Sequence, residues 1–183
     1  VDVLLNSLYN YYKNEKNLKN LLDIIETNSK VSLRIIDWFV TNYSKKFNIF
    51  YSIYQEEGGQ NTFDEEGNKL YKQFNTYQSY KSQLKSYSKK KFDPFCRRDR
   101  ITFDLDDDII ETTIGQLNFF KWAIENNVID YIDNNYLAIE NDMNNRNSTS
   151  KNRSPAESNS NNENAKTRKR REELSVSACK CIK

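Results

Sequence analysis

The stretch that most constrains the fold is "TIGQLNFFKWAIENNVIDY", residues 113–131, because it predicts a helix with apolar side chains on more than one side. At 100° per residue, five apolar side chains share one face. They are Leu117, Phe120, Ile124, Val128 and Tyr131. Phe119 and Trp122 lie elsewhere, and Thr112 or Thr113 can supply the N-cap. Other elements have to cover such a helix, so we expect it at the centre of the domain.

Other segments predict shorter elements around this helix. We expect helices at residues 2–14, 17–26, from Ser32 onward and at 76–90, and strands at 48–55, 69–74 and 100–103. Four glycines and two prolines are too few for a fold built from many tight turns. The predicted fold class is therefore α+β, a mainly helical single domain with a small antiparallel sheet.

Composition divides the chain into three parts. Residues 1–143 form the predicted helical α+β domain. Residues 144–165 are rich in Asn and Ser and have almost no apolar residue. They cannot offset their ordering entropy by burial, so we expect a disordered linker. Residues 166–183 form a basic C-terminal segment, which we interpret as the start of a truncated element.

Several classes of function are excluded or made improbable by what the sequence lacks. The chain has no histidine, which removes the commonest general base and metal ligand at neutral pH. Cys96, Cys179 and Cys181 are too few for a secreted disulfide framework or a closed zinc site. No glycine lies in a phosphate-binding motif, and no apolar run reaches the ~20 residues that span a bilayer. We expect a non-enzymatic protein of a reducing compartment, with no cofactor, metal, small-molecule substrate or membrane partner.

The segment "ITFDLDDDII", residues 101–110, resembles the first motif of haloacid dehalogenase-type phosphatases. That resemblance implies Asp104 as nucleophile and Asp106 as general acid, with Mg²⁺ beside them. Asp108 stands where the family has Thr, and no doubly wound sheet is predicted after residue 110. A magnesium-dependent phosphatase is thus a remote alternative. The other interpretation is an acidic loop that stabilises the N-terminus of the following helix through its dipole.

The best candidate for a functional surface is the basic and aromatic block at residues 77–100. Residues 81–100 carry eight cations and two acids. The predicted contacts are Lys81, Lys85, Lys89, Lys90, Lys91, Arg97, Arg98 and Arg100, with Tyr80 and Tyr87 as stacking platforms. Such a ridge can follow phosphates. It can also be a solvated helix face, a docking surface for protein, or a partner for the acidic run at 104–111.

Two further segments bear on this surface. Pro94 in "FDPF", residues 92–95, disfavours helix at Asp93. If Phe92 and Phe95 are buried, the segment is a corner that anchors the helix end and leaves the cations outward. The second segment, "KTRKRR", is a nuclear localisation signal, a phosphate-binding arm or a helix start. Its candidate contacts are Arg168, Lys169, Arg170 and Arg171.

Four blocks carry a resemblance to a known family. They read "SLRIIDWFVTNYSKKFNI", "YKSQLKSYSKKKFDPFCRRDRI", "TTIGQLNFFKWAIENNVIDYI" and "RKRREELSVSACKCI". In them the chain resembles an uncharacterised protein family of the nucleocytoplasmic large DNA viruses, of the mimivirus kind. The resemblance implies a viral protein of the host cytoplasm (the viral factory) or of the virion, and it supplies no catalytic residues.

Together these observations predict a non-enzymatic viral binding module. Its expected partner is nucleic acid or a nucleoprotein complex in viral gene expression. The alternative is a structural or minor virion protein that docks on another viral protein through its aromatic surface.

Overall fold

The computed structural model describes residues 3–25, 30–54, 56–57, 60–96, 100–105, 108–151 and 180–182 of the 183-residue chain. Its helical elements are α1 (Val3–Tyr12), α2 (Glu15–Ile25), α3 (Leu33–Trp38), the π-helical turn η1 (Phe39–Tyr43), α4 (Ser44–Lys46), α5 (Thr76–Phe92), α6 (Ile114–Glu125), α7 (Val128–Asn134) and α8 (Tyr136–Lys151). Its strands are β1 (Phe50–Tyr54), β2 (Glu56–Glu57), β3 (Gln60–Asn61), β4 (Tyr71–Asn75), β5 (Ile101–Leu105), β6 (Asp108–Thr112) and β7 (Lys180–Ile182). The predicted α+β class, mainly helical with small antiparallel sheets, is confirmed.

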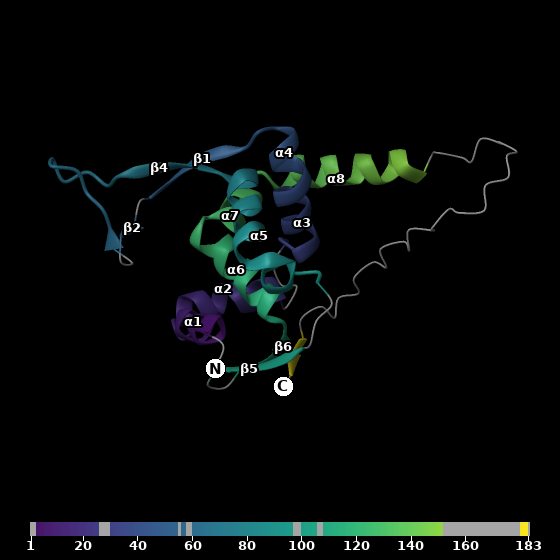
Figure 1. The fold of residues 1–183 in the computed structure, drawn as a ribbon. Helices are drawn as coiled ribbons and strands as arrows, with labels where there is room; N and C mark the ends of the chain where they lie inside the picture. The colour runs from purple at the N-terminus through teal and green to yellow at the C-terminus, as the bar shows by residue number, and fades with distance from the viewer. Residues whose placement is uncertain are drawn as a thin grey trace, which may run out of the picture.

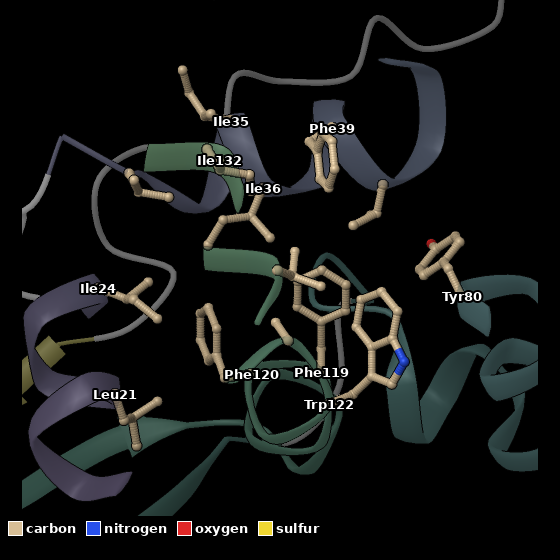
Figure 2. Close-up of a cluster of buried hydrophobic side chains, with 14 of the residues drawn as sticks. Leu21, Ile24, Ile35, Ile36, Phe39, Tyr80, Phe119, Phe120, Trp122 and Ile132 are labelled. Atoms are coloured by element: carbon tan, nitrogen blue, oxygen red, sulfur yellow. The ribbon is translucent and has the colours of Figure 1, made fainter. Parts of the chain in front are cut away.

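Helix α6 lies at the centre of the helical body, as expected, with α1, α2, α5 and α7 packed around it (Figure 1). The Thr113 hydroxyl caps it by accepting a hydrogen bond from the Gln116 amide at 3.2 Å. Figure 2 shows Phe119, Phe120 and Trp122 projecting from α6 in different directions into the surrounding side chains. The two-sided apolar pattern of the sequence is therefore satisfied by contacts on several sides of the helix.

The predicted helix at 113–131 is in fact two helices. Asn127 has a φ of 51°, in the left-handed region, and α7 begins at the next residue. Asparagine tolerates this conformation better than most residues. The Asn126 side-chain amide also donates to the Trp122 carbonyl at 2.8 Å and satisfies the end of α6.

The helix expected from Ser32 onward forms, but it widens into a π-helical turn. Ser32 accepts from the Ile35 amide as an N-cap. Ile35, Ile36, Phe39 and Val40 are all buried, so this helix is covered on two sides. The chain reaches Lys46 through η1 and α4, and the Ser44 hydroxyl donates to the Val40 carbonyl at 3.0 Å.

Strands β1 and β4 form a hairpin that projects from the helical body (Figure 1), and we call it and the described residues between the two strands the arm. The predicted strands at 48–55 and 69–74 are confirmed in this pair. Tyr51 and Phe74 lie opposite each other and hold the base of the arm on the body. The Tyr51 ring stacks on Tyr131 at 4.8 Å, and its hydroxyl donates to the Asn126 carbonyl at 2.7 Å.

A second sheet corrects the interpretation of the acidic segment. Residues 108–112 form strand β6, which pairs antiparallel with β5, and not a loop that caps the next helix. The hairpin forms because Phe103 and Ile110 lie opposite each other and are both fully buried. Strand β7 adds to β6, so residues 180–182 return to the domain.

The boundary of the domain also differs from the expectation. Helix α8 runs to Lys151, so residues 144–151 are helical where a disordered linker was predicted. Ile139 and Met143 are buried, and the Arg146 guanidinium lies 5.6 Å from the centre of the Trp38 ring. These contacts anchor the helix on α3, which local composition does not reveal. Residues 152–165 lie outside the described residues.

Candidate functional site

Helix α5 carries the lysines of the predicted basic ridge, and its backbone breaks near its end. The Asn75 side chain caps the helix by accepting from the Gln78 amide at 2.9 Å. Ser88 has φ 63° and ψ 165°, which is not helical. Helical spacing would place Lys81, Lys85 and Lys89 in one row along the helix, but because of the break Lys89 does not continue the row of Lys81 and Lys85. After the break, the helix ends at Phe92, whose ring packs on Phe119 and Trp122 of α6.

Residues 92–96, which we call the corner, follow that turn. Phe92 is fully buried, and its ring centre lies 5.7 Å from those of Phe119 and Trp122 and 5.9 Å from that of Tyr80. Pro94 is buried as well, whereas Phe95 is half-buried. The Asp93 carboxylate accepts from the Phe95 amide at 2.9 Å and closes the turn. The anchoring expected for "FDPF" is confirmed for Phe92 and in part for Phe95.

Two buried amide side chains of α6 tie the corner to the centre of the domain. Asn118 donates to the Lys91 carbonyl at 2.9 Å, and Gln116 donates to the Pro94 carbonyl at 3.1 Å. The Gln116 carbonyl oxygen in turn accepts from the Thr112 hydroxyl at 2.9 Å. Buried hydrogen bonds of this kind are costly to break because the partner is left unsatisfied. In the sequence, the sign of this role is the presence of Gln116 and Asn118 within the apolar first half of α6.

Gly115 allows α6 to approach the corner closely. A Cβ at this position would lie 3.0 Å from the Asp93 carbonyl oxygen and 3.4 Å from that of Lys90. We expect Gly115→Val to lower the free energy of unfolding by about 1–3 kcal/mol through overpacking. Gly115→Ala should lack the gain of about 1 kcal/mol that alanine brings to an open helix. Urea denaturation checks both variants, and a gain of that size for Gly115→Ala would contradict the close approach.

The lysines themselves lie outside this anchored structure. Lys81, Lys85, Lys89 and Lys90 are exposed, and we call these four the basic surface. Helix α5 contains no acidic residue. Within the described part of the chain, the ion pairs are Lys46–Asp142, Arg100–Glu111 and Lys121–Glu125, and none involves the basic surface. Its charge is therefore not neutralised by a described neighbour in direct contact.

The remaining predicted contacts differ from this group. Lys91 is exposed, and its carbonyl is the acceptor for Asn118. Arg100 forms an ion pair with Glu111 at 3.4 Å, so part of the acidic run neutralises one predicted contact. Arg97 and Arg98 lie outside the described residues, as do Arg168, Lys169, Arg170 and Arg171.

The two predicted stacking platforms are not equivalent. Tyr80 is 7% exposed and lies beside Trp122 in the core (Figure 2), so its assignment as a platform for a base is wrong. It belongs to the apolar side of α5 that packs on α6. Tyr87 is 37% exposed, and one side of its ring is stacked on Phe92, with the two planes 17° apart. The basic surface thus offers charge with little aromatic surface.

The acidic motif at 101–110 does not have the surroundings of the phosphatase motif. Asp104 is exposed on β5, opposite Ile109 of the antiparallel partner strand. Asp106 lies outside the described residues. Among the residues that the structure describes, no group of three or more His, Cys, Asp or Glu side chains could hold a metal ion. In the same part of the chain, no helix has the length and apolar character to cross a membrane.

Fold and surface together define a small α+β protein with an anchored basic helix end. Comparison with known families then places it: residues 1–182 match the model of the family of unknown function DUF7197, and the chain belongs to that family. It is 40% identical over 143 residues to the uncharacterized protein L507 of Acanthamoeba polyphaga mimivirus. The match covers 75% of this chain and 50% of that relative, so the chain spans about half the relative's length. No solved structure matches. The expected kinship with a giant-virus protein family is confirmed.

Proposed function

We propose that this chain is a non-enzymatic nucleic-acid-binding module of viral gene expression, with the basic surface as its contact to phosphates. One observation carries the proposal: four exposed lysines gather on one acid-free segment and have no ion-pair partner among the described residues. The corner supports it, because buried contacts of Phe92, Gln116 and Asn118 fix the backbone from which these lysines project.

The chemistry of the surface indicates which kind of binding to expect. Lysine is a flexible point charge and suits phosphate contacts, which position a nucleic acid but carry no sequence information. Tyr80 is buried and Tyr87 is partly covered, so stacking on bases contributes little. The module should therefore bind duplex and single strands with little preference for sequence. Its place of action would be the viral factory in the host cytoplasm, or the virion.

Charge reversal on the basic surface tests the proposal. We expect Lys85→Glu/Lys89→Glu to lower the affinity for a labelled duplex DNA or single-stranded RNA by roughly tenfold or more in fluorescence anisotropy, because two phosphate contacts are lost. The control is Lys13→Glu/Lys19→Glu, which makes the same change in net charge at exposed positions around α1 and α2. Equal losses in both variants would overturn the assignment of the contact to α5. Circular dichroism establishes that both variants are folded.

A structural role in the virion is the second candidate, and the arm favours it. Phe50, Phe63 and Tyr71 of the arm are each more than half exposed. Exposed apolar groups gathered in one place are typical of protein contacts. In this case a salt-resistant complex with another viral protein is expected, and the basic surface would not be needed for it.

A further inference from the structure

The arm concentrates the exposed apolar surface of the molecule. Ten large apolar side chains of the described residues are exposed; five of them belong to the arm, and a sixth, Phe47, lies three residues before it. These six are Phe47, Phe50, Tyr54, Phe63, Leu70 and Tyr71. A two-stranded hairpin is only marginally stable in water without further support. The arm therefore exposes apolar surface that a partner can bury, and such a contact would stabilise the hairpin.

The exposed aromatic side chains of the arm lie on one face. In the register of β1 and β4, Tyr51 and Ile53 lie on the inner face, where Tyr51 contacts the body. The opposite side, which we call the outer face, carries Phe50, then Ser52 with Gln73, then Tyr54 with Tyr71. Tyr54 and Tyr71 pack together with ring centres 4.6 Å apart, and Gln73 donates to the Ser52 hydroxyl at 2.9 Å.

The same face continues past the strands. Phe63 lies opposite Lys69 in an isolated bridge, and the Lys69 ammonium lies 4.7 Å from the centre of the Tyr54 ring. Phe50, Tyr54, Phe63 and Tyr71 are 61%, 42%, 55% and 58% exposed. The outer face therefore carries one aromatic pair, Tyr54 with Tyr71, flanked by the single aromatic side chains Phe50 and Phe63 and by polar residues, in a defined register.

Charges of opposite sign lie at the tip of the arm and on the helices beside its base. Far from the body, Asp64, Glu65 and Glu66 form a tight exposed turn. The Asp64 carboxylate accepts from the amides of Asn68 at 2.7 Å and Glu66 at 3.0 Å, so this turn is ordered. On the body beside the base of the arm, the Lys45 ammonium of α4 lies 5.6 Å from the centre of the Tyr77 ring, and Lys81 of α5 follows Tyr77 by one helical turn.

We propose that the arm is a homodimerisation element. Two copies pack their outer faces together with the arms antiparallel, so that Asp64–Glu66 of each copy lies near Lys45 and Lys81 of the other. The arrangement is isologous, which requires a self-complementary surface. A single copy meets that requirement, because the acidic tip of its arm and the lysines beside the base of the arm exchange places under a two-fold rotation. The dimer forms in the absence of nucleic acid, and it shares one residue, Lys81, with the basic surface.

The available area predicts how strong this dimer is. Four half-exposed aromatic side chains offer about 100 Å² each, or about 800 Å² in total for two copies. This is below the ~1,200–2,000 Å² of standard stable interfaces. The polar pairs and charged ends add to it, so a reversible dimer at micromolar concentrations is expected rather than an obligate one.

Sedimentation equilibrium of the 183-residue chain over a concentration series, without nucleic acid, tests the proposal. The wild type should show a monomer–dimer equilibrium. Tyr54→Ser/Tyr71→Ser should weaken it by roughly tenfold or more, because both central aromatic side chains are lost. Leu137→Ser, at an exposed position of α8 outside the arm, is the control and should leave the equilibrium unchanged. Circular dichroism monitors folding.

A charge exchange tests the antiparallel arrangement. Glu65→Lys/Glu66→Lys and Lys45→Glu/Lys81→Glu should each weaken the dimer, and a chain that carries all four changes should regain it. A wild type that stays monomeric at about 100 μM, well above the concentrations of a micromolar equilibrium, would overturn the proposal. A dimer that is insensitive to Tyr54→Ser/Tyr71→Ser would also overturn the proposal.

Loss of nucleic-acid binding by that variant, with no dimer in the wild type, would assign the outer face to nucleic acid instead.

Discussion

Phe92→Ala is expected to lower the free energy of unfolding by about 3–5 kcal/mol, the range for large-to-small changes of a core aromatic residue. Phe92 is fully buried among Tyr80, Phe119 and Trp122, three rings from two different helices. Neither α5 nor α6 can close the space that the missing ring would leave without moving the corner. Urea denaturation followed by circular dichroism measures the loss.

The matched control for this substitution is Leu137→Ala. Leu137 is 72% exposed on α8, so its truncation should change the free energy of unfolding by no more than about 0.5 kcal/mol. A loss below about 1 kcal/mol for Phe92→Ala would contradict the packing described for the corner, because burial of a whole aromatic side chain contributes more than that.

The second large effect is expected at alkaline pH. Burial raises the pKa of the Tyr51 hydroxyl well above its ordinary value of 10.0. The unfolded chain therefore loses this proton at a lower pH than the folded chain, and stability falls as pH rises above about 10. For one such group the loss is about 1.4 kcal/mol for each pH unit, up to the folded-state pKa. Below pH 10 the hydroxyl is protonated in both states, and its contribution is complete.

Tyr51→Phe isolates this contribution. The variant should be less stable than the wild type at pH 8, because the Asn126 carbonyl loses its hydrogen bond at the base of the arm. Between pH 10 and 11.5, however, its stability should fall less steeply, by about 1.4 kcal/mol per pH unit. Denaturation curves at four pH values measure both slopes. Equal slopes for the two proteins would mean that Tyr51 ionises freely in the folded state.

The parts of the fold that could be predicted from the sequence are those specified locally. The apolar pattern of α6 indicated a central helix, Ser32 and Thr113 marked helix starts, and the aromatic alternation around residues 50–54 indicated a strand. Each signal depends on neighbours within one or two turns. The relation to a giant-virus family likewise followed from contiguous blocks.

The features that were missed depend on contacts between distant segments. Strand β6 forms because Ile110 is buried opposite Phe103 and because β7 pairs with it, and neither contact is visible in the acidic string "DLDDD". The break at Ser88 and the left-handed Asn127 allow helices to change direction, which helical periodicity cannot reveal. Helix α8 is extended through contacts of Met143 and Arg146 with the body.

In the candidate site, too, some features could be predicted from the local sequence and others depend on contacts between distant segments. Exposure of the lysines was predictable because charged side chains are rarely buried without a partner. The burial of Tyr80 was not predictable, because a tyrosine in a helix can face either the solvent or the core. Neutralisation of the basic block by the acidic run was one of the alternatives that the sequence offered, but the particular pair Arg100–Glu111 depends on the register of β5 and β6. The amides of Gln116 and Asn118 gained their role only from the corner folded against them.

The salt dependence of binding tests the central claim most directly. If four lysines of the basic surface contact phosphates of duplex DNA, log affinity should fall with log salt with a slope of about −3.6. In Lys85→Glu/Lys89→Glu the slope should drop to about half of that or less, and in Lys13→Glu/Lys19→Glu it should be nearly unchanged. The opposite result, no binding at low salt or the same slope in all three proteins, would show that the basic surface is not a phosphate contact.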